Sequence, residues 1–187
     1  AVFAASPLRE LIMVAAAGAA YRFARKDALR ANGITFAPIK EVAILFAGIF
    51  ATMVPALDWL ALNADRLAIR SPGQFYWATG TLSSFLDNAP TYLNFLSAAL
   101  GLHQLTLGNA DHMQVLLAEH GRFLQAISVA SVFFGANTYI GNGPNFMVKS
   151  IAEHAGIECP TFFGYMARYS IPVLLPIFAV VWLLFFR

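Results

Sequence analysis

Two short polar stretches, residues 83–91 and 135–145, carry closely spaced hydroxyl, amide and carboxyl groups within apolar sequence. Neutral oxygen atoms of this kind, together with backbone carbonyl groups, coordinate hard cations such as sodium. Glycines in the second stretch let the backbone turn its own carbonyl groups inward. We expect sodium to be held through Asp87, Asn88, Asn137 and Asn142. The complete set of residues expected to line an ion or substrate site is Ser83, Ser84, Asp87, Asn88, Thr91, Asn137, Thr138, Gly141, Asn142 and Asn145.

Asp87 is the residue with the sharpest chemical implication. A carboxylate near the centre of a bilayer costs at least ~2.5–3.5 kcal/mol on insertion scales and is a functional candidate by default. Either a proton or a sodium ion, but not both, would neutralise it, which gives an exchange mechanism. The alternative interpretation is structural, because an aspartate at this place can also cap the helix that follows.

The composition predicts an integral membrane protein. Of the 187 residues, 59% are apolar and 12% are charged, whereas about 45–50% apolar is usual in soluble domains. One crossing needs roughly 20 apolar helical residues, so this length predicts about four or five membrane segments. The net charge of +2, without a basic stripe, argues against nucleic acid as a partner. Cys159 is the single cysteine, which excludes an intramolecular disulfide, and no cofactor is expected besides transported sodium and protons.

The two polar stretches divide the chain into elements of an all-α membrane protein. Pro90 disfavours helical geometry at Ala89, so we expect two half-length helices that meet at residues 87–90 as a re-entrant hairpin. Lys and Arg in a short loop mark the cytoplasmic side, which places the C-terminus outside. The predicted elements are scaffold helices in 1–62, the hairpin in 63–102, an outer loop with a small surface helix in 103–122, a broken transmembrane helix in 123–156, and a last transmembrane helix in 157–187. The scaffold helices contain the basic cytoplasmic loop at 22–32. The broken helix has its halves at 123–134 and 145–154.

A pair of helix breaks at membrane depth is typical of the binding site of a secondary transporter, where two inverted repeats meet. Only one such set is present in this sequence. We therefore interpret the chain as one inverted-repeat half, and expect an upstream repeat of the same transporter to complete the site. The other expected partner is the lipid bilayer of a bacterial inner membrane.

At these stretches the chain resembles the ion transporter superfamily, specifically sodium/proton antiporters of the NhaD type and the related citrate-transporter-like and arsenite permease families. Residues 41–50, 83–92 and 137–149 carry the resemblance. It implies a C-terminal repeat whose hairpin tip and unwound helix form an elevator-type transport domain, often in a homodimer. The chain departs from the dicarboxylate symporters, which have Ser-Asn-Thr at the hairpin tip where this chain has residues 87–91, Asp-Asn-Ala-Pro-Thr. An acidic tip fits a cation or proton carrier better than a multivalent carboxylate.

The leading prediction is accordingly a sodium/proton antiporter in which Asp87 is the titrating carrier. The first alternative is a transporter of citrate or another carboxylate with a coupled cation, in which the anion binds at the N-termini of half-helices. The second is a non-transporting membrane module that is stable only with its partner repeat. An enzyme is not expected, since an intramembrane aspartyl protease needs two carboxylates and Asp58 lies too near the membrane edge to pair with Asp87.

Overall fold

The computed structural model describes residues 8–25, 27, 37–154 and 156–187. The chain divides into two compact units, Ala1–Phe46 and Ala47–Arg187, which are described separately. The first unit contains α1 (Leu8–Phe23), whose residues are exposed within the unit, and the start of α3 (Ala37–Leu62). Part of the predicted basic loop at 22–32, including Lys26 and Arg30, lies outside the described residues.

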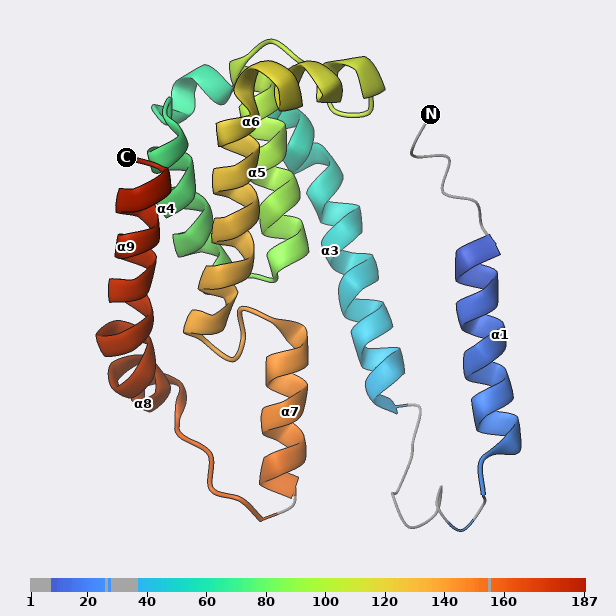
Figure 1. The fold of residues 1–187 in the computed structure, drawn as a ribbon. Coiled ribbons are helices and arrows are strands. Elements are labelled where there is room, and N and C mark those ends of the chain that lie inside the picture. The colour runs from blue at the N-terminus through green and yellow to red at the C-terminus, as the bar shows by residue number, and fades with distance from the viewer. Residues whose placement is uncertain (1–7, 26, 28–36, 155) are drawn as a thin grey trace. The chain divides into compact units, whose positions relative to one another are not determined.

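The second unit is a helical assembly, and the described part of the chain contains no strand, in agreement with the predicted all-α class. Figure 1 shows α4, α5 and α6 side by side, with α9 along α4 and α6. Following α3, the elements are the short helix η1 (Ala64–Leu67), α4 (Pro72–Ser83), α5 (Asn88–Leu102), α6 (Ala110–Phe133), the 3-10 turn η2 (Phe134–Asn137), α7 (Gly143–His154), α8 (Phe162–Tyr165), the π-helix η3 (Met166–Leu174) and α9 (Leu175–Phe185).

Local capping sets the starts of the helices around the hairpin. α4 begins with a capping box, in which the Ser71 hydroxyl accepts from the backbone N–H of Gln74 and the Gln74 side chain accepts from the Ser71 N–H. Pro72 follows at the first helical position, where its missing N–H has no helical partner to lose. α5 begins after Asp87, whose carboxylate accepts from the Asn88 N–H at 2.8 Å.

The reversal between α4 and α5 lies earlier than the sequence predicted. We expected the half-helices to meet at residues 87–90, but the turn occupies residues 84–87 and α5 already includes Ala89 and Pro90. The prediction was wrong because Pro90 falls in the first turn of α5, where N–H groups have no partner within the helix and a proline therefore removes no hydrogen bond. The residues of this hairpin turn are thus 84–87.

The second half of the stretch 103–122, predicted as an outer loop with a small surface helix, belongs to a longer helix. Residues 103–109 are not helical, whereas Ala110 begins α6, which continues to Phe133. His120 has non-helical angles (φ −128°, ψ 26°) and kinks α6, so the residues before it form a short helical arm. The His120 ring stacks on that of His103, with ring centroids 3.6 Å apart. Burial, and to a lesser degree His120, lowers the pKa of His103.

The aromatic core of the second unit lies between α4, the end of α6 and α9. Tyr76, Phe134 and Phe178 are almost fully buried. The Phe134 ring stacks on Phe178 at 4.4 Å, and the Tyr76 hydroxyl donates to the Phe178 carbonyl at 3.1 Å. Gly80 lies under the Phe134 ring, where a Cβ would come within 2.5 Å of ring atoms. This core fixes the end of α6 against α4 and the last helical run.

The last helical run, Phe162–Phe185, is continuous through α8, η3 and α9. Within the described residues it is the one helix long and apolar enough to cross a membrane by length and composition. The sequence predicted about four or five membrane segments, and the other segments stay predictions. Pro172 lies inside the π-helical part of this run.

Candidate functional site

The two predicted polar stretches meet in the folded second unit. The first contributes the hairpin turn, and the second contributes residues 134–142, here called the break segment, which separates α6 from α7 (Figure 1). The Asn137 amide nitrogen donates to the Ser84 hydroxyl at 2.9 Å. The Thr138 hydroxyl donates to the Ser84 carbonyl at 2.5 Å and accepts from the Gly141 N–H at 2.9 Å. Ser84 therefore ties the end of α4 to the break segment.

Ser83 and Asn88 join α6 to the same junction. The buried Ser83 hydroxyl donates to the Ser131 carbonyl at 2.6 Å. We assign the Asn88 amide with its nitrogen toward Ser131 and Gly141, because the carbonyl oxygens there, at 2.8 and 3.0 Å, are acceptors. Asn88 then bridges the start of α5, α6 and the break segment.

At Gly141 the backbone of the break segment approaches the end of α4 closely. A Cβ at this position would lie 2.6 Å from the Ser83 carbonyl oxygen and 3.0 Å from those of Ser84 and Gly135. Only a residue without a side chain fits between these carbonyl groups. The sequence predicted Gly141 as a residue that turns carbonyl groups toward an ion. The structure shows in addition that its lack of a side chain permits the close approach to these carbonyl groups.

Two buried side-chain oxygen atoms of the predicted set have no hydrogen-bond partner within the described residues. They are Asn137 Oδ1 and Thr91 Oγ1, in residues that are 6% and 0% exposed. A buried polar atom left unpaired costs about 1–3 kcal/mol, so such atoms call for an explanation. A bound cation or an ordered water would supply the missing partner. Outside the predicted set, the buried atoms that lack a partner in the described part of the chain are Thr79 Oγ1, Asn94 Oδ1 and His103 Nε2.

Three members of the predicted set lie at the margin of this network. Asp87 is half-buried and its carboxylate caps α5, as the structural alternative expected. Asn142 is half-buried, and its carbonyl accepts from the N–H of Asn145 in the first turn of α7. Asn145 is exposed. In the described part of the chain, no hydrogen bond joins the side chains of Asn142 or Asn145 to Ser84 or Asn137.

The site chemistry is that of oxygen ligands. The described residues contain no group of three or more His, Cys, Asp or Glu side chains placed to hold a metal ion. Hydroxyl, amide and carbonyl oxygens instead surround the contact between the hairpin turn and the break segment. Hard cations prefer such ligands over soft sulfur or imidazole ligands.

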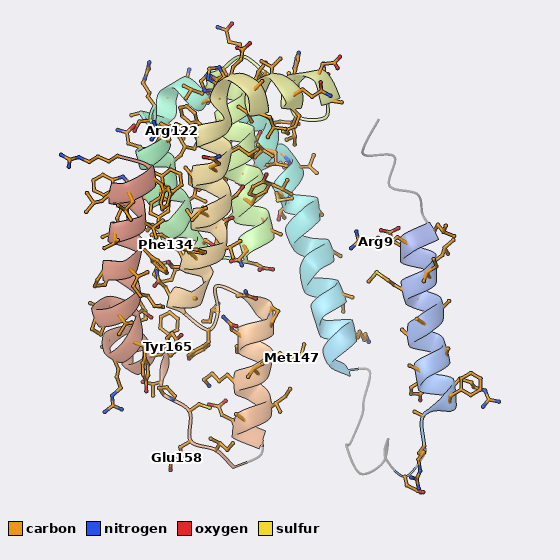
Figure 2. All side chains as sticks on the ribbon, viewed as in Figure 1. Arg9, Arg122, Phe134, Met147, Glu158 and Tyr165 are labelled. Atoms are coloured by element: carbon orange, nitrogen blue, oxygen red, sulfur yellow. The ribbon has the colours of Figure 1, made fainter. Side chains whose placement is uncertain are left out.

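Sequence reasoning missed two residues of the last helical run that contact the break segment. The Ser170 hydroxyl donates to the Asn137 carbonyl at 2.5 Å, and the Tyr165 hydroxyl donates to the Ala136 carbonyl at 3.1 Å. Figure 2 labels Tyr165, which lies beside the break segment, and Phe134 at the start of that segment. The available signal was a serine two residues before Pro172, in a mostly apolar run that also contains Arg168.

A family model described as "Putative citrate transport" matches residues 2–186 of the chain. No curated protein matches the chain, and neither does any solved structure. The match covers almost the whole sequence, including both polar stretches and the last helical run, and it agrees with the resemblance to citrate-transporter-like proteins.

Proposed function

This chain belongs to the citrate transport family, and from that membership we propose that it moves citrate or a related carboxylate across the membrane together with a cation. Membership makes it a membrane transporter. The coupled cation, the binding residues and the direction of coupling are the finer parts of the proposal. The sequence favoured sodium/proton antiport; the family favours the carboxylate alternative.

The observation that carries the cation proposal is the unpaired Asn137 Oδ1. Its amide nitrogen is held by Ser84, so the oxygen points away from that bond and is free to act as an acceptor. Thr91 Oγ1 is a second buried oxygen of the same set without a partner among the described residues. A cation bound at either atom would replace the hydrogen bond that the atom lacks. Sodium is the ion expected, because the available ligands are neutral oxygens.

The N-terminus of α7 is the favoured place for the carboxylate. Unpaired N–H groups and a partial positive charge at a helix start attract anions. At the start of α5 the Asp87 carboxylate already occupies this position. At the start of α7, Pro144 has no N–H and the Asn145 N–H bonds the Asn142 carbonyl, so the Gly143 N–H and the partial positive charge of the helix would attract the anion there. Gly143, the first residue of α7, is exposed, and a Cβ there would have no neighbour within 4 Å. An anion could therefore approach the α7 backbone closely.

Sodium/proton antiport remains the second candidate, and Asp87 is the residue that favours it. Asp87 is half-buried at the end of the hairpin turn, next in sequence to Asn88. One backbone N–H donates to its carboxylate, and the carboxylate oxygens have further lone pairs that could accept a cation. In this mechanism Asp87→Asn abolishes sodium-driven proton movement. If the variant still moves protons when a sodium gradient is applied, sodium/proton antiport through Asp87 is excluded.

The same proposal includes the partners that a half-site needs. We expect an upstream inverted repeat to supply the remaining ligands opposite the hairpin turn, and a homodimer in a bacterial inner membrane with the C-terminus outside. The start of α7 is exposed, so that a second repeat could contact it.

The test uses the full-length protein in proteoliposomes. Uptake of labelled citrate is measured with and without an inward sodium gradient, and internal pH is followed in parallel. Thr91→Val removes an unpaired buried hydroxyl without changing volume, and Thr79→Val does the same in α4 outside the predicted site. We expect Thr91→Val, but not Thr79→Val, to raise the sodium concentration for half-maximal uptake several-fold. Citrate uptake that does not depend on sodium in the wild-type protein would refute the coupling to sodium. Absence of uptake of citrate and of other labelled di- and tricarboxylates would refute the proposed substrate class.

A further inference from the structure

The last helical run contains a feature that the proposed site does not use. Residues Met166–Leu174 form a π-helix, and its closing hydrogen bond runs from the Leu175 N–H to the Ser170 carbonyl, five residues apart. π-helical turns are rare and often occur at functional sites. Ser170 is the buried polar residue of this segment, at 2% exposure.

The π-helix explains how two hydroxyl groups reach neighbouring carbonyl groups. Tyr165 and Ser170 are five residues apart, and in an α-helix of 3.6 residues per turn they would point about 140° away from each other. The wider i→i+5 turn brings such residues close to the same face. Tyr165 and Ser170 accordingly donate to Ala136 and Asn137, which are consecutive residues of the break segment.

These two bonds act on the backbone that carries Asn137. Carbonyl groups at a helix end have no partner within the helix, and here the last helical run supplies one for each. The Asn137 residue is then held at two points, with its carbonyl on Ser170 and its amide nitrogen on Ser84. With both points fixed, the direction of Asn137 Oδ1 is fixed as well.

We propose that Ser170 and Tyr165 are positioning residues for the cation site, and that the π-helix of the last helical run exists to aim their hydroxyl groups at the break segment. The inference rests on the proposed function, in which Asn137 Oδ1 is a cation ligand. Groups that orient a ligand from behind typically change metal affinity 10–100-fold when they are removed. Because Ser170 does not contact the transported ion, its loss should weaken cation affinity and leave the maximal rate largely intact.

The chain offers a matched control for a purely structural role. Ser97 in α5 is also almost fully buried, and its hydroxyl donates to the carbonyl of Leu57 in α3 at 2.8 Å. Ser97→Ala and Ser170→Ala therefore delete the same kind of bond between helices. If Ser170 only stabilises the fold, the two variants lose similar stability and neither changes the cation dependence of uptake.

The experiment measures citrate uptake by the full-length protein in proteoliposomes over a range of sodium concentrations, together with the thermal melting of each variant. We expect Ser170→Ala to raise the half-maximal sodium concentration about tenfold, with a maximal rate within about twofold of wild type. Tyr165→Phe removes only a hydroxyl and should shift the same parameter in the same direction. Ser170→Thr keeps the hydroxyl and should restore the wild-type value. Ser97→Ala should leave the sodium dependence unchanged.

The outcomes separate the two levels of the proposal. If wild-type uptake does not respond to sodium, the proposed sodium coupling fails and the positioning role falls with it. A second outcome is that wild-type uptake responds to sodium while Ser170→Ala and Tyr165→Phe both show the same sodium dependence as Ser97→Ala. In that case the coupling to sodium stands and the positioning role is overturned. A lower maximal rate with unchanged half-maximal sodium concentration in both variants also overturns it. Tyr165→Phe adds no atoms, so it decides the question even if Ser170→Thr fits poorly.

Discussion

Replacing Gly141 by alanine inserts a methyl group between backbone atoms that cannot rotate away. The new Cβ would lie 2.6 Å from the Ser83 carbonyl oxygen, and 3.0 Å from those of Ser84 and Gly135. An ordinary contact begins near 3.4 Å, so the shortest of these distances must grow by about 0.8 Å (3.4 minus 2.6). The end of α4 and the break segment would have to move apart by a similar amount.

Overpacking of this kind typically costs about 1–3 kcal/mol. At roughly 2–4 °C per kcal/mol for a chain of this size, a cost of about 2 kcal/mol lowers the melting temperature by about 4–8 °C. The assay is thermal unfolding of the full-length protein in detergent, followed by tryptophan fluorescence. Separation of the two segments should also weaken the bonds that Ser84 makes to Asn137 and Thr138, because these cross the same contact.

Gly143→Ala is the matched control, two residues further along the same stretch. A Cβ at Gly143 has no neighbour within 4 Å, and alanine is favoured over glycine within a helix. We expect this variant to melt at the wild-type temperature or about 1–3 °C above it. If Gly141→Ala melts within a degree of Gly143→Ala, the close approach of the break segment to the end of α4 is wrong.

Three further predictions concern other parts of the second unit. Lowering the pH from about 8 to about 5 should reduce stability, because burial and His120 lower the pKa of His103 in the folded chain. In the unfolded chain this histidine takes up its proton already from about pH 6.5 downward. The melting temperature of His103→Gln should therefore fall less steeply with pH over this range than that of the wild-type protein. Ser71→Ala should cost about 1 kcal/mol by removing the capping box of α4, whereas Ser71→Thr retains most of the stability in the same melts. Thr79→Val should leave the melting temperature unchanged or raised, since its buried hydroxyl has no partner within the residues that the structure describes. A large decrease would mean that this hydroxyl is bonded.

The sequence located the helix interruptions because they depend on local chemistry. Glycine, proline and clustered polar residues disfavour continuous helix wherever they occur, and the structure interrupts its helices at both stretches. The exact turn between α4 and α5 was displaced because a proline is compatible with either a break or a first helical turn. Choosing between these requires knowing that Asp87 caps α5.

The composition and the two polar stretches by themselves determined the helical class, the membrane character and the resemblance that the family match supports. The tertiary structure decided which polar groups meet. Asn137 reaches Ser84 across 53 residues, and Ser170 reaches Asn137 across 33 residues. Sequence periodicity reports only preferences among neighbouring residues, whereas these contacts depend on how α4, α6 and the last helical run pack. The unpaired Asn137 oxygen, and the hydroxyl groups that orient it from the last helical run, are consequences of that packing alone.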